Sequence, residues 1–192
     1  MQKILSIVLA LLLLMAFAPG VLAAEEEVEA PALSEFTLEN AWELISHYGW
    51  EGVTGSIAQV SLQFWRPATL QKVDLAQKMS DAGYLAGYLA ADSSFYVILQ
   101  NYGIDLEEYQ GIIEESGFEN IRAVSVNGRA FVIYDEPQEN GTFCRVAATQ
   151  ETDGKILEFV FYYESDDAEN VEDVGILFDV VIATVRDAKE SQ

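Results

Sequence analysis

The chain of 192 residues has one cysteine, one histidine and ten lysine or arginine residues. The single cysteine, Cys144, permits neither a disulfide within the chain nor a zinc site built from cysteines. The ten basic residues face 32 acidic ones, so the net charge is −22, and no basic cluster is available for the phosphates of a nucleic acid. We therefore expect no nucleic-acid partner.

The single histidine also limits the possible chemistry. His47 would have to serve in any Ser-His-Asp triad or Cys-His pair. It lies beside Tyr48 and Gly49 at the end of a predicted helix, where an imidazolium stabilises the helix terminus. The sequence contains no P-loop, Rossmann glycine pattern, nucleophile elbow or EF-hand. We predict no catalytic residue, no metal site and no cofactor.

Residues 1–23 are typical of a secretory signal peptide. Lys3 precedes an apolar run over 4–18 that only Ser6 interrupts, and residues 21–23 (Val-Leu-Ala) offer a cleavage site. The run is shorter than the roughly 20 residues of a membrane span. We predict cleavage rather than anchoring, and hence a secreted or extracytoplasmic protein with no stable membrane insertion.

The next segment, residues 24–34, contains four glutamates and Pro31 and is too polar to bury a surface. We interpret it as an acidic disordered linker. Hydrophobic residues make up 51% of the chain, which is enough for a folded core. Residues 35–192 are predicted to form a single α+β domain.

Local patterns predict the elements of this domain. Thr37 is a candidate helix cap before an apolar stripe that ends at Gly49, and Asp105 is a second cap before a helix that ends at Gly117. Alternation predicts one strand over 58–65. Other predicted elements are a helix over 74–82 and hairpins of 84–91 with 95–101, 121–126 with 129–135 and 142–149 with 155–163. A last helix is predicted to start at Asp166 and Asp167, and its apolar stripe runs from 171 to 186.

Several of these strands are apolar on both faces, which indicates that both faces of the sheet are covered. The predicted fold is therefore a mostly antiparallel sheet of about seven strands with helices packed on both faces. The order of elements from Trp50 to Arg186 resembles that of a known fold. Three short segments add to this resemblance: residues 81–84 (Asp-Ala-Gly-Tyr), 126–128 (Val-Asn-Gly) and 153–159 (Asp-Gly-Lys-Ile-Leu-Glu-Phe).

This order resembles the αβα sandwich shared by the PsbP proteins of photosystem II and a Ran-binding nuclear import factor. It is similar to small secreted relatives of that fold in gut-type anaerobic bacteria. The resemblance is at the level of the fold, in which no catalytic residues are shared. It implies a binding or assembly scaffold, and a fold alone does not define a function.

All three tryptophans lie between residues 42 and 65. Trp42 belongs to the apolar stripe of the first helix and is predicted to be buried. Trp50 falls in a glycine-rich loop and Trp65 on the polar side of its strand, so both are candidate ligand-binding residues with exposed rings. The alternative is that a neighbouring loop covers them.

Two further expectations concern the later strands. Cys144 alternates with Val146 and Ala148, which predicts a buried, unreactive thiol. Residues 157–163 combine high strand propensity with a single charge, a composition that aggregates when exposed. We interpret Lys155, Glu158 and Glu164 as charges that oppose this aggregation.

The sequence as a whole predicts a secreted, non-catalytic binding or interaction module. Its partner is expected to be a protein or a neutral or cationic ligand, because the net charge repels anionic polymers. The alternative is a secreted hydrolase of a cell-wall or dietary polymer. A concave pocket that holds carboxylates with shifted pKa values favours the hydrolase, and a filled, flat surface favours the binding module.

Overall fold

The computed structural model describes residues 33–136, 142–164 and 168–188, with side chains from residue 173 onward in the last stretch. They belong to the second of two compact units, Ala32–Gln192. The predicted signal peptide over 1–23 and nearly all of the linker over 24–34 lie outside the described residues. Among the described helices, none combines the length and apolar character needed to cross a membrane.

The helices and strands of the described residues follow one another along the chain as an α+β arrangement. The helices are α2 (Leu38–Tyr48), α3 (Gln77–Asp81), α4 (Leu106–Glu115) and α5 (Ala168–Ala183), with a short 3-10 helix η1 (Ala58–Val60). The strands are β1 (Gly52–Ile57), β2 (Leu62–Pro67), β3 (Gln71–Val73), β4 (Tyr84–Leu89), β5 (Ser93–Gln100), β6 (Glu119–Val126), β7 (Arg129–Glu136), β8 (Thr142–Gln150), β9 (Ile156–Glu164) and β10 (Arg186–Asp187).

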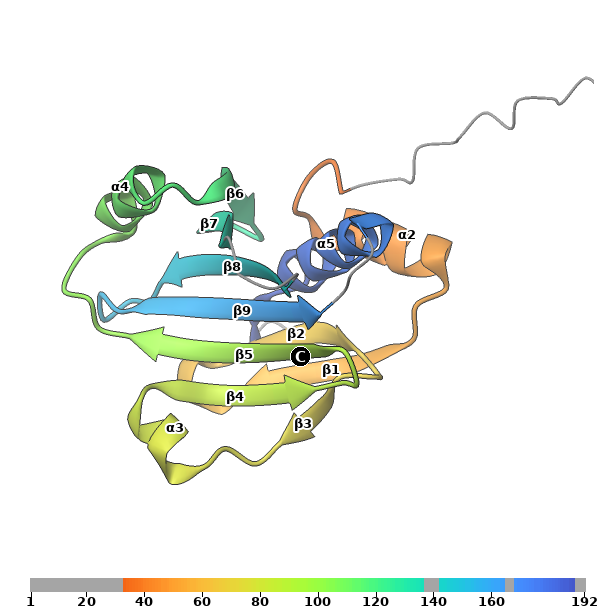
Figure 1. Cartoon of the computed structure of the whole chain (residues 1–192), viewed down its shortest axis with the longest axis horizontal. Coiled ribbons are helices and arrows are strands. Elements are labelled where there is room, and N and C mark those ends of the chain that lie inside the picture. The colour runs from red at the N-terminus through yellow and green to blue at the C-terminus, as the bar shows by residue number, and fades with distance from the viewer. Residues whose placement is uncertain (1–32, 137–141, 165–167, 189–192) are drawn as a thin grey trace, which may run out of the picture. The chain divides into compact units, whose positions relative to one another are not determined.

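Seven strands form the main sheet in the order β3-β4-β5-β9-β8-β7-β6, and each neighbouring pair is antiparallel (Figure 1). The β6–β7 hairpin turns at Asn127 and Gly128, which both have positive φ, as a tight two-residue turn requires. The predicted antiparallel sheet of about seven strands is confirmed.

Alternation along the strands separates two apolar cores. Phe159 and Phe161 of β9 join the larger core with residues of α2, α5, β1 and β2, and the Phe161 ring stacks on Phe178 at 5.7 Å. Val160 points to the opposite face and joins a smaller core with Tyr109 and Ile113 of α4. Helices therefore cover both faces of the sheet, as predicted from strands that are apolar on both sides.

The two predicted helix caps are present. The Thr37 side chain accepts a hydrogen bond from the Asn40 amide at 3.3 Å, and α2 ends at Gly49 in the left-handed conformation. The Asp105 side chain accepts from the Glu108 amide at 2.9 Å and so begins α4. Each cap satisfies amides that a helix leaves without a partner inside itself.

The prediction of a single strand over 58–65 is wrong. Residues 58–60 form η1, Ser61 has a φ of 52°, and only then does β2 begin. β2 pairs with β1, which occupies the segment interpreted as a glycine-rich loop, and with β10 in a separate three-stranded sheet. Close aromatic packing explains the glycines of β1: a Cβ on Gly52 would lie 2.2 Å from the Trp65 ring, and one on Gly55 would lie 2.8 Å from Phe64.

A group of charges on the larger-core side joins the sheet to α5. Arg145 donates to both carboxylate oxygens of Asp135 at 2.6 and 2.9 Å and to Oδ1 of Asp179 at 3.3 Å. Arg122 also donates to Asp179, at 3.0 Å. Arg145 therefore points away from the face on which its neighbour Cys144 is buried, as alternation requires.

Candidate functional site: a pocket beneath α4

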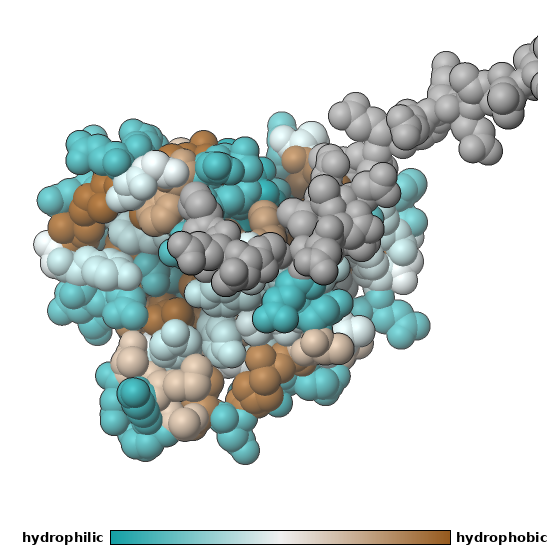
Figure 2. All heavy atoms as spheres, in the orientation of Figure 1, coloured by the Kyte–Doolittle hydropathy of each residue, from teal (hydrophilic) through white to brown (hydrophobic). Residues whose placement is uncertain are grey.

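Hydrophobic side chains reach the surface over α4 and the strands beside it (Figure 2). Tyr102, in the loop before α4, and Ile112, on α4, are each 49% exposed. They are among the most exposed large apolar side chains of the described residues. Apolar surface beside a hollow is typical of a binding site.

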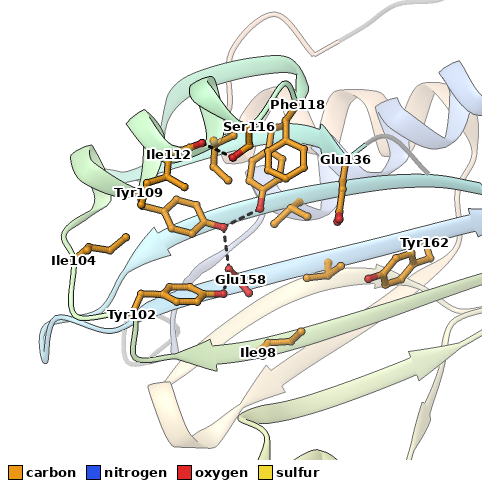
Figure 3. A pocket seen from close by; sticks show the side chains of 14 residues that line it. Ile98, Tyr102, Ile104, Tyr109, Ile112, Ser116, Phe118, Glu136, Glu158 and Tyr162 are labelled. Atoms are coloured by element: carbon orange, nitrogen blue, oxygen red, sulfur yellow. Dashed lines mark hydrogen bonds between the residues drawn. The ribbon is translucent and has the colours of Figure 1, made fainter. Parts of the chain in front are cut away.

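A pocket of about 430 Å³ lies between α4 and the sheet face that carries the smaller core (Figure 3). Its volume falls within the range of small-molecule sites. The residues that line it come from β5, the loop before α4, α4, the segment after it, and β7, β8 and β9: Ile98, Tyr102, Ile104, Tyr109, Ile112, Ile113, Ser116, Phe118, Tyr134, Glu136, Val146, Glu158, Val160 and Tyr162.

The strand register places the floor of the pocket in three rows across β7, β8 and β9. One row contains Glu136, Cys144 and Tyr162, the next contains Tyr134, Val146 and Val160, and the third contains Val132, Ala148 and Glu158. Successive rows are two residues apart and so point to the same face. The floor is thus apolar in the middle and carries one carboxylate in each outer row.

Glu158 is the buried polar group of this floor. It is 8% exposed, and its Oε1 accepts hydrogen bonds from the hydroxyls of Tyr102 and Tyr109, each at 2.9 Å. The Tyr109 hydroxyl also lies 2.8 Å from that of Tyr134. Since the single Tyr109 proton is given to Glu158, Tyr134 must donate to Tyr109. The three phenols therefore form a polarised cluster around one carboxylate oxygen.

Burial raises the pKa of Glu158, and the charge of Glu136 adds to this, whereas the two tyrosine hydrogen bonds act in the opposite direction. Burial also raises the pKa values of Tyr102, Tyr109 and Tyr134, which keeps all three phenols protonated. The phenols serve as donors, because an ionised phenol beside a carboxylate would be repelled.

The other outer row holds Glu136 and Cys144. The Cys144 thiol donates to Oε2 of Glu136 at 3.7 Å. Burial, aided by Glu136, raises the pKa of Cys144 to about 12. The thiolate is the reactive form of cysteine, so this thiol is a poor nucleophile. The prediction that Cys144 faces the core is confirmed by its 1% exposure.

None of the 14 residues that line the pocket is a lysine, an arginine or a histidine. Aromatic rings form much of the lining instead: the Phe118 ring stacks on the Tyr134 ring at 5.1 Å, and the Tyr102 ring lies 5.8 Å from the Tyr109 ring. Both carboxylates therefore face an aromatic, apolar hollow without a cation from the described residues.

The tryptophans predicted to bind ligand lie elsewhere, in the segment of α2, β1 and β2. Trp65 is only 5% exposed because its ring packs over Gly52, so the expectation of an exposed ring there is wrong. Trp50 is half-buried and stacks on Tyr48 at 4.5 Å. Trp42, expected to be buried, is 44% exposed, since α2 buries Ala41, Leu44 and Ile45 instead. Binding at Trp50 and Trp65 stays a prediction.

Sequence reasoning missed the residues that build the pocket. Glu158 was interpreted as a charge that protects its strand from aggregation, whereas its carboxylate lies in the pocket. The available signal was its position as the single charge among residues 157–163, on a strand that is otherwise apolar on both faces. Tyr102 and Tyr109 gave no such signal, because tyrosines at these spacings are common in an ordinary core.

Comparison with known proteins gives a fold and no family. No protein-family model matches the chain, and no curated protein matches it. The solution structure of cyanobacterial PsbP (CyanoP) from Synechocystis sp. PCC 6803 is similar, with a TM-score of 0.50 and 14% identity over 70% of this chain and 91% of that chain. The Saccharomyces cerevisiae Ran-binding protein Mog1p has a TM-score of 0.48 and 13% identity, over 72% and 96%. The likeness to CyanoP confirms the predicted PsbP-like fold.

Proposed function

We propose that this protein is a secreted, non-catalytic binding module that takes a neutral or cationic small ligand into the pocket beneath α4. The observation that carries the proposal is a pocket of about 430 Å³ whose lining is apolar except for phenols, one serine and two carboxylates. Export is supported by the signal-like pattern of residues 1–23.

The concave shape by itself favours a hydrolase, but the charge and the side chains of the lining favour binding over catalysis. The chain carries a net charge of −22, and two carboxylates line the pocket, so an anionic ligand is repelled. The lining contains no histidine or lysine, so its carboxylates are the groups left for acid–base chemistry, and the Cys144 thiol is kept protonated by burial. Such a site supplies contact area and a few oriented hydrogen bonds, which is what binding requires.

The proposal is tested with a neutral apolar dye, N-phenylnaphthylamine, whose fluorescence rises on transfer to an apolar site. We expect saturable binding that Val160→Phe abolishes, because Val160 is 6% exposed on the pocket floor and a larger ring fills the hollow. The matched control is Val53→Phe, at a 44% exposed site on β1. Equal dye binding by both variants, or none by the wild type, would overturn the proposal.

A hydrolase remains the second candidate because of one specific observation. The pocket is concave and holds a carboxylate, Glu158, whose pKa is raised by burial, which is a feature of a general acid. Against it, the lining has no asparagine, glutamine or tryptophan to hold sugar hydroxyls, and Glu158 is already bonded to two phenols. Release of reducing sugar or peptide from cell-wall or dietary polymers, lost in Glu158→Gln, would favour this candidate.

A further inference from the structure

The two carboxylates of the pocket stand at opposite ends of its apolar floor. Glu136 shares a row with Cys144 and Tyr162, and Glu158 is four residues from Tyr162 along β9. Four residues correspond to about 13 Å of strand, at roughly 3.3 Å per residue. The two carboxylates therefore belong to the outer rows of the floor, with the row of Val146 and Val160 between them.

The row between the carboxylates is suited to a hydrocarbon chain. It consists of Tyr134, Val146 and Val160, and it is covered by Tyr109 and Ile113 from α4. Val146 and Val160 are 3% and 6% exposed and offer no hydrogen-bonding side-chain atom. Methylene groups that lie across this row are removed from water without loss of a hydrogen bond.

Each end of the floor has capacity left for a hydrogen-bond donor. Both phenols that bond to Glu158 use Oε1, and no described residue donates to its Oε2. At the other end, the hydrogen bond that Glu136 receives from the described residues comes from the thiol of Cys144, a weak donor at 3.7 Å. Burial of a carboxylate without a cation is unfavourable, and it becomes favourable when an ammonium group arrives.

Resting on the proposed function as a binding module, we propose that the pocket beneath α4 binds a linear aliphatic diamine or polyamine. One ammonium group lies at Oε2 of Glu158, the methylene chain crosses Val146 and Val160, and the second ammonium group lies at Glu136 (Figure 3).

The arrangement predicts that a diamine binds more tightly than a monoamine or a diol of the same length. A monoamine satisfies one carboxylate and leaves the other without a cation, and a diol of equal length supplies no charge to either. A charge-assisted hydrogen bond at the second carboxylate corresponds to at least about tenfold in affinity. The two carboxylates stand in rows separated by about 13 Å of strand, and this spacing favours a long diamine such as diaminooctane over diaminobutane.

The experiment is isothermal titration of the full exported chain with diaminooctane, diaminobutane, octylamine and octanediol. We expect diaminooctane to bind at least about tenfold more tightly than the other three. In Glu136→Gln the ratio of diaminooctane to octylamine affinity should fall to unity. Glu119→Gln removes one charge from an exposed site on β6 and is the control for the net charge of the chain; it should keep the ratio of the wild type.

Different failures point to different errors. Equal affinities for diaminooctane and octylamine, or a ratio that Glu119→Gln lowers as much as Glu136→Gln, would overturn the diamine proposal. If octanediol and the neutral dye then still bind and Val160→Phe blocks them, the binding module stands without the diamine. If neither dye nor amine binds, the proposed function itself fails.

Discussion

The hydroxyl of Tyr109 on α4 donates a hydrogen bond to Oε1 of Glu158 on β9 at 2.9 Å. The residues are 49 positions apart in the chain, and the bond joins the helix that covers the pocket to its floor. A buried carboxylate is unfavourable in a protein interior unless donors surround it. The cost of burying Glu158 is thus linked to the position of α4 over the pocket.

This relationship makes stability depend on pH through Glu158. Its folded pKa lies above the ordinary value of 4.5, so ionisation is harder in the folded protein than in the unfolded chain. The unfolded state then binds fewer protons over that interval, and stability falls as pH rises from the ordinary pKa through the raised one. A glutamine at position 158 does not titrate, so the Glu158→Gln variant does not lose stability through this group as the pH rises.

We therefore expect the thermal midpoint of Glu158→Gln to rise relative to that of the wild type as the pH increases from about 4 to about 7. Circular dichroism melts of both proteins across this range measure the difference. Of the titratable groups that face Glu158, the tyrosines stay protonated throughout, and Glu136 is common to both proteins. Parallel midpoint curves would contradict the role of Glu158.

The buried thiol gives a second prediction. Cys144 is 1% exposed and has a pKa of about 12, so thiol reagents should label the native protein far more slowly than the unfolded chain. Cys144→Ala should cost about 1 kcal/mol in the free energy of unfolding, since it deletes one buried atom. Absorbance with a disulfide reagent and urea titrations measure the two quantities. Rapid labelling without denaturant would be inconsistent with the packing against Val146 and Ala148.

The tryptophans give a third prediction, through their different exposures. In variants with a single tryptophan, acrylamide should quench Trp42 most strongly, Trp50 less and Trp65 least. Trp42 is 44% exposed on α2, whereas Trp65 is 5% exposed and packs over Gly52. The measurement is the quenching constant of each variant, with free tryptophan as the reference. Stronger quenching of Trp65 than of Trp42 would contradict this packing.

What could be predicted from the sequence was governed by signals that lie close together in the chain. Thr37, Asp105 and the Asn127-Gly128 turn each act within a few residues, and the structure contains all three. Apolar residues on both faces of β5 and β7 were sufficient to predict helices on both faces of the sheet. These features were sufficient to predict the antiparallel main sheet and the two capped helices α2 and α4.

The pocket depends on contacts between residues far apart in the chain, and sequence patterns did not indicate it. Tyr102, Tyr109 and Tyr134 meet Glu158 only because the sheet register and the cap at Asp105 bring α4 over β9. The rows that place Glu136 and Glu158 at opposite ends of the floor follow from pairing of β7, β8 and β9. Neither arrangement has a local pattern in the sequence.

Strand β1 of the three-stranded sheet was missed for a different reason. Glycines are unfavourable in strands, so Gly52 and Gly55 indicated a loop. In the structure they lie in β1 opposite β2, and the absence of side chains there makes room for the rings of Trp65 and Phe64. A strand of this kind is recognisable only when the aromatic partner is known.

This packing leads to a fourth prediction, a matched pair of glycine substitutions. In Gly52→Ala the new Cβ would lie 2.2 Å from the Trp65 ring and 2.5 Å from the carbonyl oxygen of Arg66, so ring and strand must shift. We expect a loss of about 1–3 kcal/mol in the free energy of unfolding, typical of overpacking. Gly111→Ala, within α4 where a Cβ meets nothing within 4 Å, should instead add up to about 1 kcal/mol through helix propensity. Urea titrations that follow tryptophan fluorescence measure both changes. Wild-type stability in Gly52→Ala would show that Trp65 does not pack over β1, because alanine would otherwise have no space there.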